Sequence, residues 1–91
     1  MKTTVGKVSP EERDVIQALF ERKNGLAELA KAIPADNEAL YEKVVQDMSR
    51  TAAAFKKWWD EMSRKYNWKG TEGGNWEIDF DSCEIYLNDY N

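Results

Sequence analysis

The sequence predicts a mainly α protein, in which an antiparallel helical hairpin carries a short C-terminal β-hairpin or strand. Three segments lead to this fold class: a capped amphipathic segment, a long apolar stripe after it, and an alternating segment near the C-terminus. The stripe advances in steps of four and three residues through Tyr41, Val45, Met48, Ala52, Phe55, Trp59, Met62 and Tyr66. This spacing of about 3.5 residues is typical of a helix that packs lengthwise against another helix.

The first predicted helix covers residues 9–33. Ser9 is followed three positions later by Glu12, which is the pattern of a capping box, and Pro34 ends the segment. Residues 1–8 are predicted to be an N-terminal arm.

A helix-ending signal interrupts the apolar pattern of this first helix. Asn24-Gly25 is a good C-terminal cap, so we expect one helix with a kink near residues 24–25. A helix that stops there and resumes at Leu26 is the alternative.

The second predicted helix covers residues 37–68 and follows the first after a very short connection, which makes the two helices antiparallel neighbours. Its apolar face is wider than a two-stranded coiled coil needs, because Val44, Thr51 and Trp58 lie beside the stripe. A face this wide suits a helical bundle. We therefore expect the C-terminal segment or a second copy of the chain to cover the remainder, and predict a homodimer.

The C-terminal part of the chain changes in character. Residues 69–75 are predicted to be a glycine-rich loop, and residues 76–88 alternate between apolar and polar side chains as a half-buried β segment does. The apolar positions are Trp76, Ile78, Phe80, Cys83, Ile85 and Leu87. Because two isolated strands are marginal in water, this segment must dock on the helices or pair with another chain.

Length and composition fit one domain over residues 1–91, with 42% hydrophobic side chains. The first residues lack the apolar run of a signal peptide, and no run approaches the roughly 20 residues that cross a bilayer. A single cysteine cannot form an internal disulfide. We therefore predict a cytoplasmic protein that does not bind membranes.

Charge is distributed unevenly along the chain. Residues 70–91 contain six of the 17 acidic residues and none of the 13 basic ones. An acidic segment repels phosphate, so nucleic acid is not the expected partner. A small nucleic-acid-associated regulator remains the alternative function.

Catalysis is not expected, because the sequence has no histidine and therefore lacks the commonest general base. Cys83 has acidic neighbours that disfavour its thiolate, so we interpret it as a core residue. Asp79, Asp81 and Glu84 leave open an enzyme subunit that contributes carboxylates to a shared site. We predict no metal site and no cofactor, since metal-ligand spacing is absent.

An aromatic and methionine-rich cluster is the strongest candidate for binding a peptide, an apolar ligand or another subunit. Its members are Phe55, Trp58, Trp59, Met62, Tyr66, Trp68 and Trp76. The alternative interpretation is that these residues form the core and a subunit interface.

Three short phrases are similar to a family of small bacterial proteins. They are residues 5–13, which read VGKVSPEER, residues 21–26, which read ERKNGL, and residues 75–80, which read NWEIDF. Together they resemble the accessory proteins of CXXX-repeat peptide modification systems. The resemblance implies a role beside a ribosomally made peptide with spaced cysteines and a separate radical maturation enzyme. Accordingly, the predicted function is a non-catalytic scaffold that holds such a peptide or its enzyme.

Overall fold

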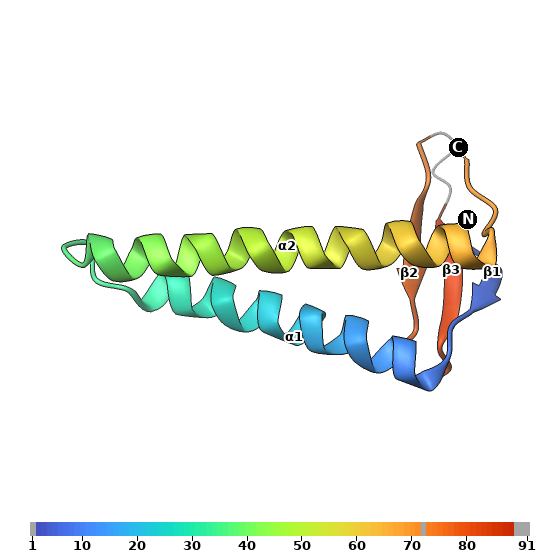
Figure 1. Cartoon of the computed structure of the whole chain (residues 1–91), viewed down its shortest axis with the longest axis horizontal. Coiled ribbons are helices and arrows are strands. Elements are labelled where there is room, and N and C mark those ends of the chain that lie inside the picture. The colour runs from blue at the N-terminus through green and yellow to red at the C-terminus, as the bar shows by residue number, and fades with distance from the viewer. Residues whose placement is uncertain (1, 72, 89–91) are drawn as a thin grey trace.

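The computed structural model describes residues 2–71 and 73–88, which form two long helices and a small antiparallel sheet. The elements follow the order β1 (Lys2–Lys7), α1 (Pro10–Ala32), α2 (Glu38–Tyr66), β2 (Asn75–Ile78) and β3 (Glu84–Asn88). The strands lie at the end of the hairpin where α1 begins and α2 ends (Figure 1). The predicted class, a mainly α helical hairpin with a small β part, is confirmed for a single copy of the chain.

Helix α1 begins with the predicted capping box. The Ser9 hydroxyl accepts a hydrogen bond from the Glu12 amide at 3.1 Å, and the Glu12 carboxylate accepts one from the Ser9 amide at 2.8 Å. The helix then runs through Gly25 without a break, so the prediction of one helix is confirmed over the alternative of two. A helical glycine costs only about 1 kcal/mol relative to alanine, and packing of α1 along α2 outweighs that cost. Ile33 is extended before the proline, so the helix ends at Ala32.

Helix α2 turns the flank of the stripe, rather than its centre, toward α1. Its buried residues are Val44, Thr51 and Trp58, which recur every seven positions. Tyr41 and Val45 of the stripe remain 51% and 40% exposed. The stripe therefore lies on one face of the hairpin, beside the contact between the two helices. Helix α2 ends at Tyr66, two residues before the predicted end, because Asn67 takes a left-handed conformation with φ of 52°.

Strand β1 corrects the prediction of an N-terminal arm over residues 1–8. It pairs antiparallel with β3, so the sheet has the order β1-β3-β2, and β2 pairs antiparallel with the other side of β3. The third strand supplies the stability that an isolated β-hairpin lacks. Residue 1 of the predicted arm and residue 72 of the predicted loop over residues 69–75 lie outside the described residues.

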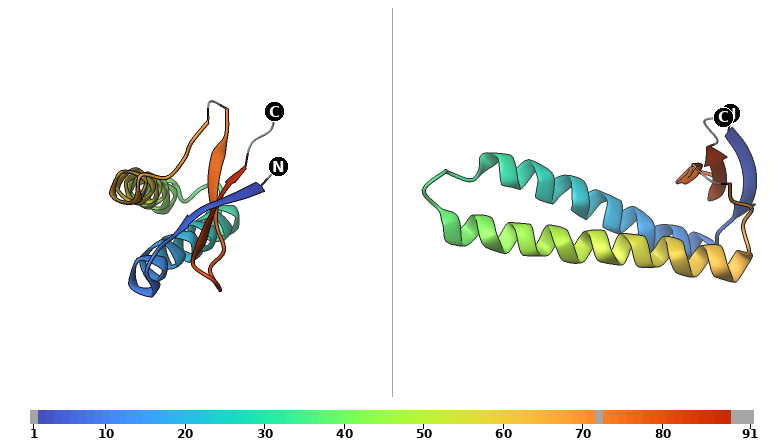
Figure 2. Two further views of the ribbon diagram at one scale, coloured as in Figure 1. Left: turned by 90° about the vertical axis from the view of Figure 1, so that its right-hand side faces the viewer. Right: turned by 90° about the horizontal axis from the view of Figure 1, so that it is seen from above.

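The sheet packs on one side of the helix pair (Figure 2). A core joins the two layers and contains Val8, Ile16, Trp58, Trp68, Cys83 and Ile85. At the turn between β2 and β3, the Phe80 ring lies 5.5 Å from the ring of Phe20, and the Arg13 guanidinium donates a hydrogen bond to the Phe80 carbonyl at 2.6 Å. The alternating positions predicted to face a core are all buried or partly buried. The sheet thus covers only the end of a hairpin that extends well beyond it (Figure 1).

Two glycine-to-alanine substitutions test this arrangement, and we expect them to change the free energy of unfolding in opposite directions. A Cβ atom at Gly6 of β1 would lie 2.8 Å from Trp68 Nε1, whereas one at Gly25 of α1 would meet no atom within 4 Å. We expect Gly6→Ala to lower the free energy of unfolding by about 1 kcal/mol, because the indole must shift. Gly25→Ala should raise it by about 1 kcal/mol. Urea unfolding followed by circular dichroism measures both, and a stabilised Gly6→Ala variant would contradict the contact.

Candidate functional site

The seven aromatic and methionine residues predicted to bind a partner gather at the junction of the hairpin and the sheet. Trp58 and Trp68 are buried, Phe55, Trp59, Met62 and Trp76 are partly buried against the core, and Tyr66 is 38% exposed. The Trp68 ring lies 5.9 Å from the Tyr66 ring, stacked at 6°, and 5.9 Å from the Trp76 ring. The Trp59 ring stands edge-on to Trp58 at 4.9 Å.

These rings pack on one another and fasten the sheet to the helices. The Trp58 indole donates a hydrogen bond to the Glu12 carbonyl at 3.1 Å, and the Trp76 indole donates one to the Lys69 carbonyl at 3.0 Å. Such contacts favour the core interpretation for most of the cluster. At this junction, Tyr66 and the outer parts of Trp59 and Trp76 remain accessible to a partner.

Polar contacts of the Glu12 carboxylate also connect the two helices at the end of the hairpin that carries the sheet. The Glu12 carboxylate accepts hydrogen bonds from Lys65 at 2.6 Å and from the Tyr66 hydroxyl. Burial raises the pKa of Glu12, but the bonds from Lys65, Ser9 and Tyr66 outweigh it and lower this pKa from 4.5 to about 2. The same bond to Glu12 raises the pKa of Lys65. This ion pair joins the start of α1 to the end of α2.

The uncovered half of the stripe forms an apolar groove on the hairpin. We call this surface the stripe face, and it is lined by Lys23, Ala30, Tyr41, Val45, Met48, Ser49 and Ala52, around a cavity of about 400 Å³. Its residues come from both helices, so the groove follows the line between them. The Lys23 ammonium lies 5.3 Å from the centre of the Phe55 ring, where the stripe begins to be covered.

A second apolar groove lies on the other side of the helix pair. We call it the opposite face, and it is lined by Val15, Ala18, Leu19, Ala54, Lys57, Trp58 and Glu61, around about 520 Å³. Val45 and Ala54 are separated by two and a half turns of about 3.6 residues, so they point in opposite directions from α2. Val15 is 53% exposed here.

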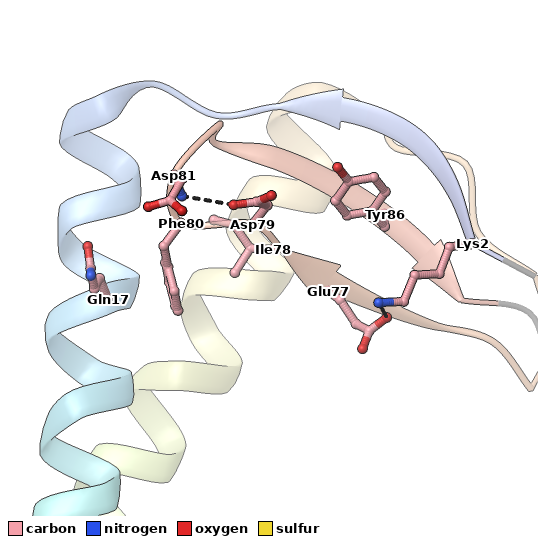
Figure 3. A pocket seen from close by; sticks show the side chains of 8 residues that line it. All are labelled: Lys2, Gln17, Glu77, Ile78, Asp79, Phe80, Asp81 and Tyr86. Carbon is pink, nitrogen blue, oxygen red and sulfur yellow. Dashed lines mark hydrogen bonds and ion pairs between the residues drawn. The ribbon is translucent and has the colours of Figure 1, made fainter.

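A polar concavity of about 570 Å³ lies between the strands, the turn that joins β2 to β3, and Gln17 of α1. Figure 3 shows Glu77, Tyr86 and Lys2 on the strands, with Asp79 and Asp81 at the turn. Lys2 pairs with Glu77 at 3.3 Å, and Asp79 accepts a hydrogen bond from the Asp81 amide at 2.9 Å. The concavity therefore brings together two of the three carboxylates proposed for a shared site, but its lining does not include Glu84.

Residues 2–71 and 73–88 contain no group of three His, Cys, Asp or Glu side chains that could hold a metal ion. Cys83 is buried in the core, where its carbonyl accepts a hydrogen bond from the Val8 amide at 3.0 Å. Neither helix of the described structure has the length and apolar character needed to cross a membrane.

Comparison with protein-family models, with curated proteins and with solved structures finds no significant match. The sequence identified the stripe but favoured its aromatic end, whereas the structure exposes the end from Tyr41 to Ala52. Lys23 and Ala30 were not singled out as binding residues. The signal that could have found them is their position on the α1 face that packs along the stripe.

Proposed function

We propose that this protein is a non-catalytic binding or scaffold protein that works as a homodimer. One face of its hairpin packs on a second copy, and the other holds a peptide or a peptide-maturation enzyme. The observation that supports this function is the exposure of apolar side chains on both sides of a layer that is two helices wide and one helix thick.

The part of the hairpin beyond the sheet has little core of its own. In the described structure, Val44 and Thr51 are the only buried residues of this part, and Thr51 is polar. The large apolar side chains left exposed along the hairpin are Val15, Phe20, Leu29, Leu40, Tyr41, Val45 and Tyr66. Contiguous exposed apolar surface often marks an interaction site in a protein. A constitutive partner on one face would supply the burial that the two helices lack.

The resemblance to accessory proteins of CXXX-repeat peptide modification systems supports a peptide or its maturation enzyme as the second partner. The sequence has neither the repeated cysteines of such a peptide nor the clustered cysteines of a radical enzyme. A protein that positions one for the other fits this composition. Apolar grooves between helices suit an amphipathic helical segment of such a partner.

Sedimentation equilibrium and calorimetry test the two halves of this proposal. We expect the wild-type protein to sediment as a dimer at micromolar concentration. A synthetic peptide with cysteines at every fourth position should bind with measurable heat, and Val15→Glu on the opposite face should weaken that binding at least tenfold. A monomer that releases no heat with the peptide would refute both halves.

A further inference from the structure

We propose that the stripe face is the surface that packs on the second copy, and that the two hairpins lie antiparallel to form a four-helix bundle. This inference rests on the proposed homodimer and specifies its surface and its direction. The opposite face then remains free for the peptide or enzyme.

The width and spacing of the stripe face fit a pair of helices. Tyr41, Val45, Met48 and Ala52 continue the steps of four and three residues that helices use to interlock. The groove also includes Ala30 from α1, so its floor spans both helices. Small residues such as Ala30 and Ala52 allow a second hairpin to approach closely. A copy of the same hairpin presents a surface of matching width and length.

The position of the sheet determines the direction of the second hairpin. The sheet stands on one side of the helix pair and at one end (Figure 2). It covers the stripe from Phe55 onward, because Phe55, Trp59 and Met62 pack against the core that includes Trp68 and Ile85. Two parallel hairpins would bring both sheets to the same place, whereas antiparallel hairpins place one sheet at each end.

The part of the stripe that the sheet does not cover also has a length that suits antiparallel packing of two hairpins. It runs from the first covered residue, Phe55, to the loop that joins the helices, so the loop of one copy ends beside the sheet of the other. Its midpoint lies between Val45 and Met48 of α2. The two-fold axis therefore passes close to these residues, and each meets its counterpart in the second copy.

Charge distinguishes the stripe face from the opposite face. The only charged residue that lines the stripe face in the described structure is Lys23, whose ammonium lies over the Phe55 ring. The opposite face is lined by two charged residues, Lys57 and Glu61. Because the cores of homodimer interfaces are depleted of charge, the stripe face is the better surface for a second copy.

A matched pair of substitutions tests the choice of face. Val45→Glu places a charge at the proposed interface, and Val15→Glu places the same charge on the opposite face at a similarly exposed position. By sedimentation equilibrium we expect Val45→Glu to raise the dimer dissociation constant at least 100-fold, since a carboxylate would be buried without a partner. Val15→Glu should change it less than about threefold. Circular dichroism checks that both variants keep their helices.

The other possible results of this sedimentation experiment also decide the assignment of the interface. Dissociation by Val15→Glu alone would overturn the assignment and move the interface to the opposite face, while leaving the proposed dimer intact. Dimers that survive both substitutions would overturn it as well. A monomeric wild-type protein would instead refute the dimer itself.

Chemical cross-linking through single added cysteines tests whether the two hairpins are antiparallel. It does not require the dimer to dissociate. With a short bismaleimide, Val45→Cys should give covalent dimers, because this residue lies next to the axis. Asp36→Cys in the hairpin loop should not, since antiparallel packing separates the two loops by roughly 30 Å at about 1.5 Å per residue. The wild-type protein, whose Cys83 is buried, is the control. Efficient cross-linking through Asp36→Cys, whether or not Val45→Cys also cross-links, would show parallel hairpins and overturn the inference.

Discussion

Replacing Trp58 by alanine should remove about 3–5 kcal/mol of the free energy of unfolding. Trp58 is 6% exposed and lies where α1, α2 and the sheet meet. Its ring contacts those of Trp59 at 4.9 Å and Trp68 at 6.5 Å, and its indole nitrogen satisfies the carbonyl of Glu12. A domain of this size has about 5–15 kcal/mol in total, so the variant should be largely unfolded near physiological temperature.

Urea titration followed by circular dichroism, at one fixed protein concentration, measures this loss. Trp58→Phe is the informative companion, because it keeps a ring in the core and removes the hydrogen bond to the Glu12 carbonyl. We expect it to cost about 1–2 kcal/mol. An unchanged midpoint for Trp58→Ala would show that this residue does not join the helices to the sheet.

The helical hairpin could be predicted because its signals are local. The capping residues Ser9 and Glu12, the proline after α1 and the apolar periodicity of α2 each act within a few residues of the chain. The predicted helix ends agree with the structure to within two residues. Asn24-Gly25 is a local signal for a helix end too, but α1 continues through it, because packing against α2 overrides that signal.

Strand β1 could not be predicted, since its partner lies at the other end of the chain. Lys2 pairs with Asn88, and the strand has an irregularity between Thr4 and Gly6 that disrupts simple alternation. Its sequence is mostly polar, so its only apolar anchor is Val5, which packs against the core. Pairing between strands so far apart in the sequence produces no recognisable pattern within a short segment of either strand.

The apolar stripe of α2 could be predicted, but the part of it that stays exposed could not. Periodicity shows that α2 has an apolar stripe, but it does not show which half another element covers. That depends on where the sheet docks, which is set by contacts between distant segments: Gly6 lies under the Trp68 indole, and Phe80 meets Phe20. The aromatic half is covered by these contacts, and the half from Tyr41 to Ala52 is left free.

Acid should weaken the fold through Glu12. A carboxyl whose pKa is lowered to about 2 in the folded protein, from 4.5, stabilises the fold fully above pH 4.5 and loses this contribution as the pH falls from 4.5 toward 2. The Glu12 side chain is 15% exposed but its partner Lys65 is 58% exposed, so solvent screens part of the interaction. We expect a contribution of about 2 kcal/mol, measured by urea unfolding at a series of pH values.

The contribution of Glu12 is isolated by comparing two neutral variants of the same helical turn. Glu12→Gln keeps an oxygen for the Ser9 amide but loses the ion pair with Lys65, so it should be about 2 kcal/mol less stable than wild type at pH 7 and nearly equal to it at pH 2. Glu11→Gln, at the exposed neighbouring position, should follow the wild-type curve throughout. A constant difference between Glu12→Gln and wild type from pH 7 to pH 2 would show that the ion pair does not set this acid sensitivity. The effect should then be attributed to the amide's poorer fit at the start of α1.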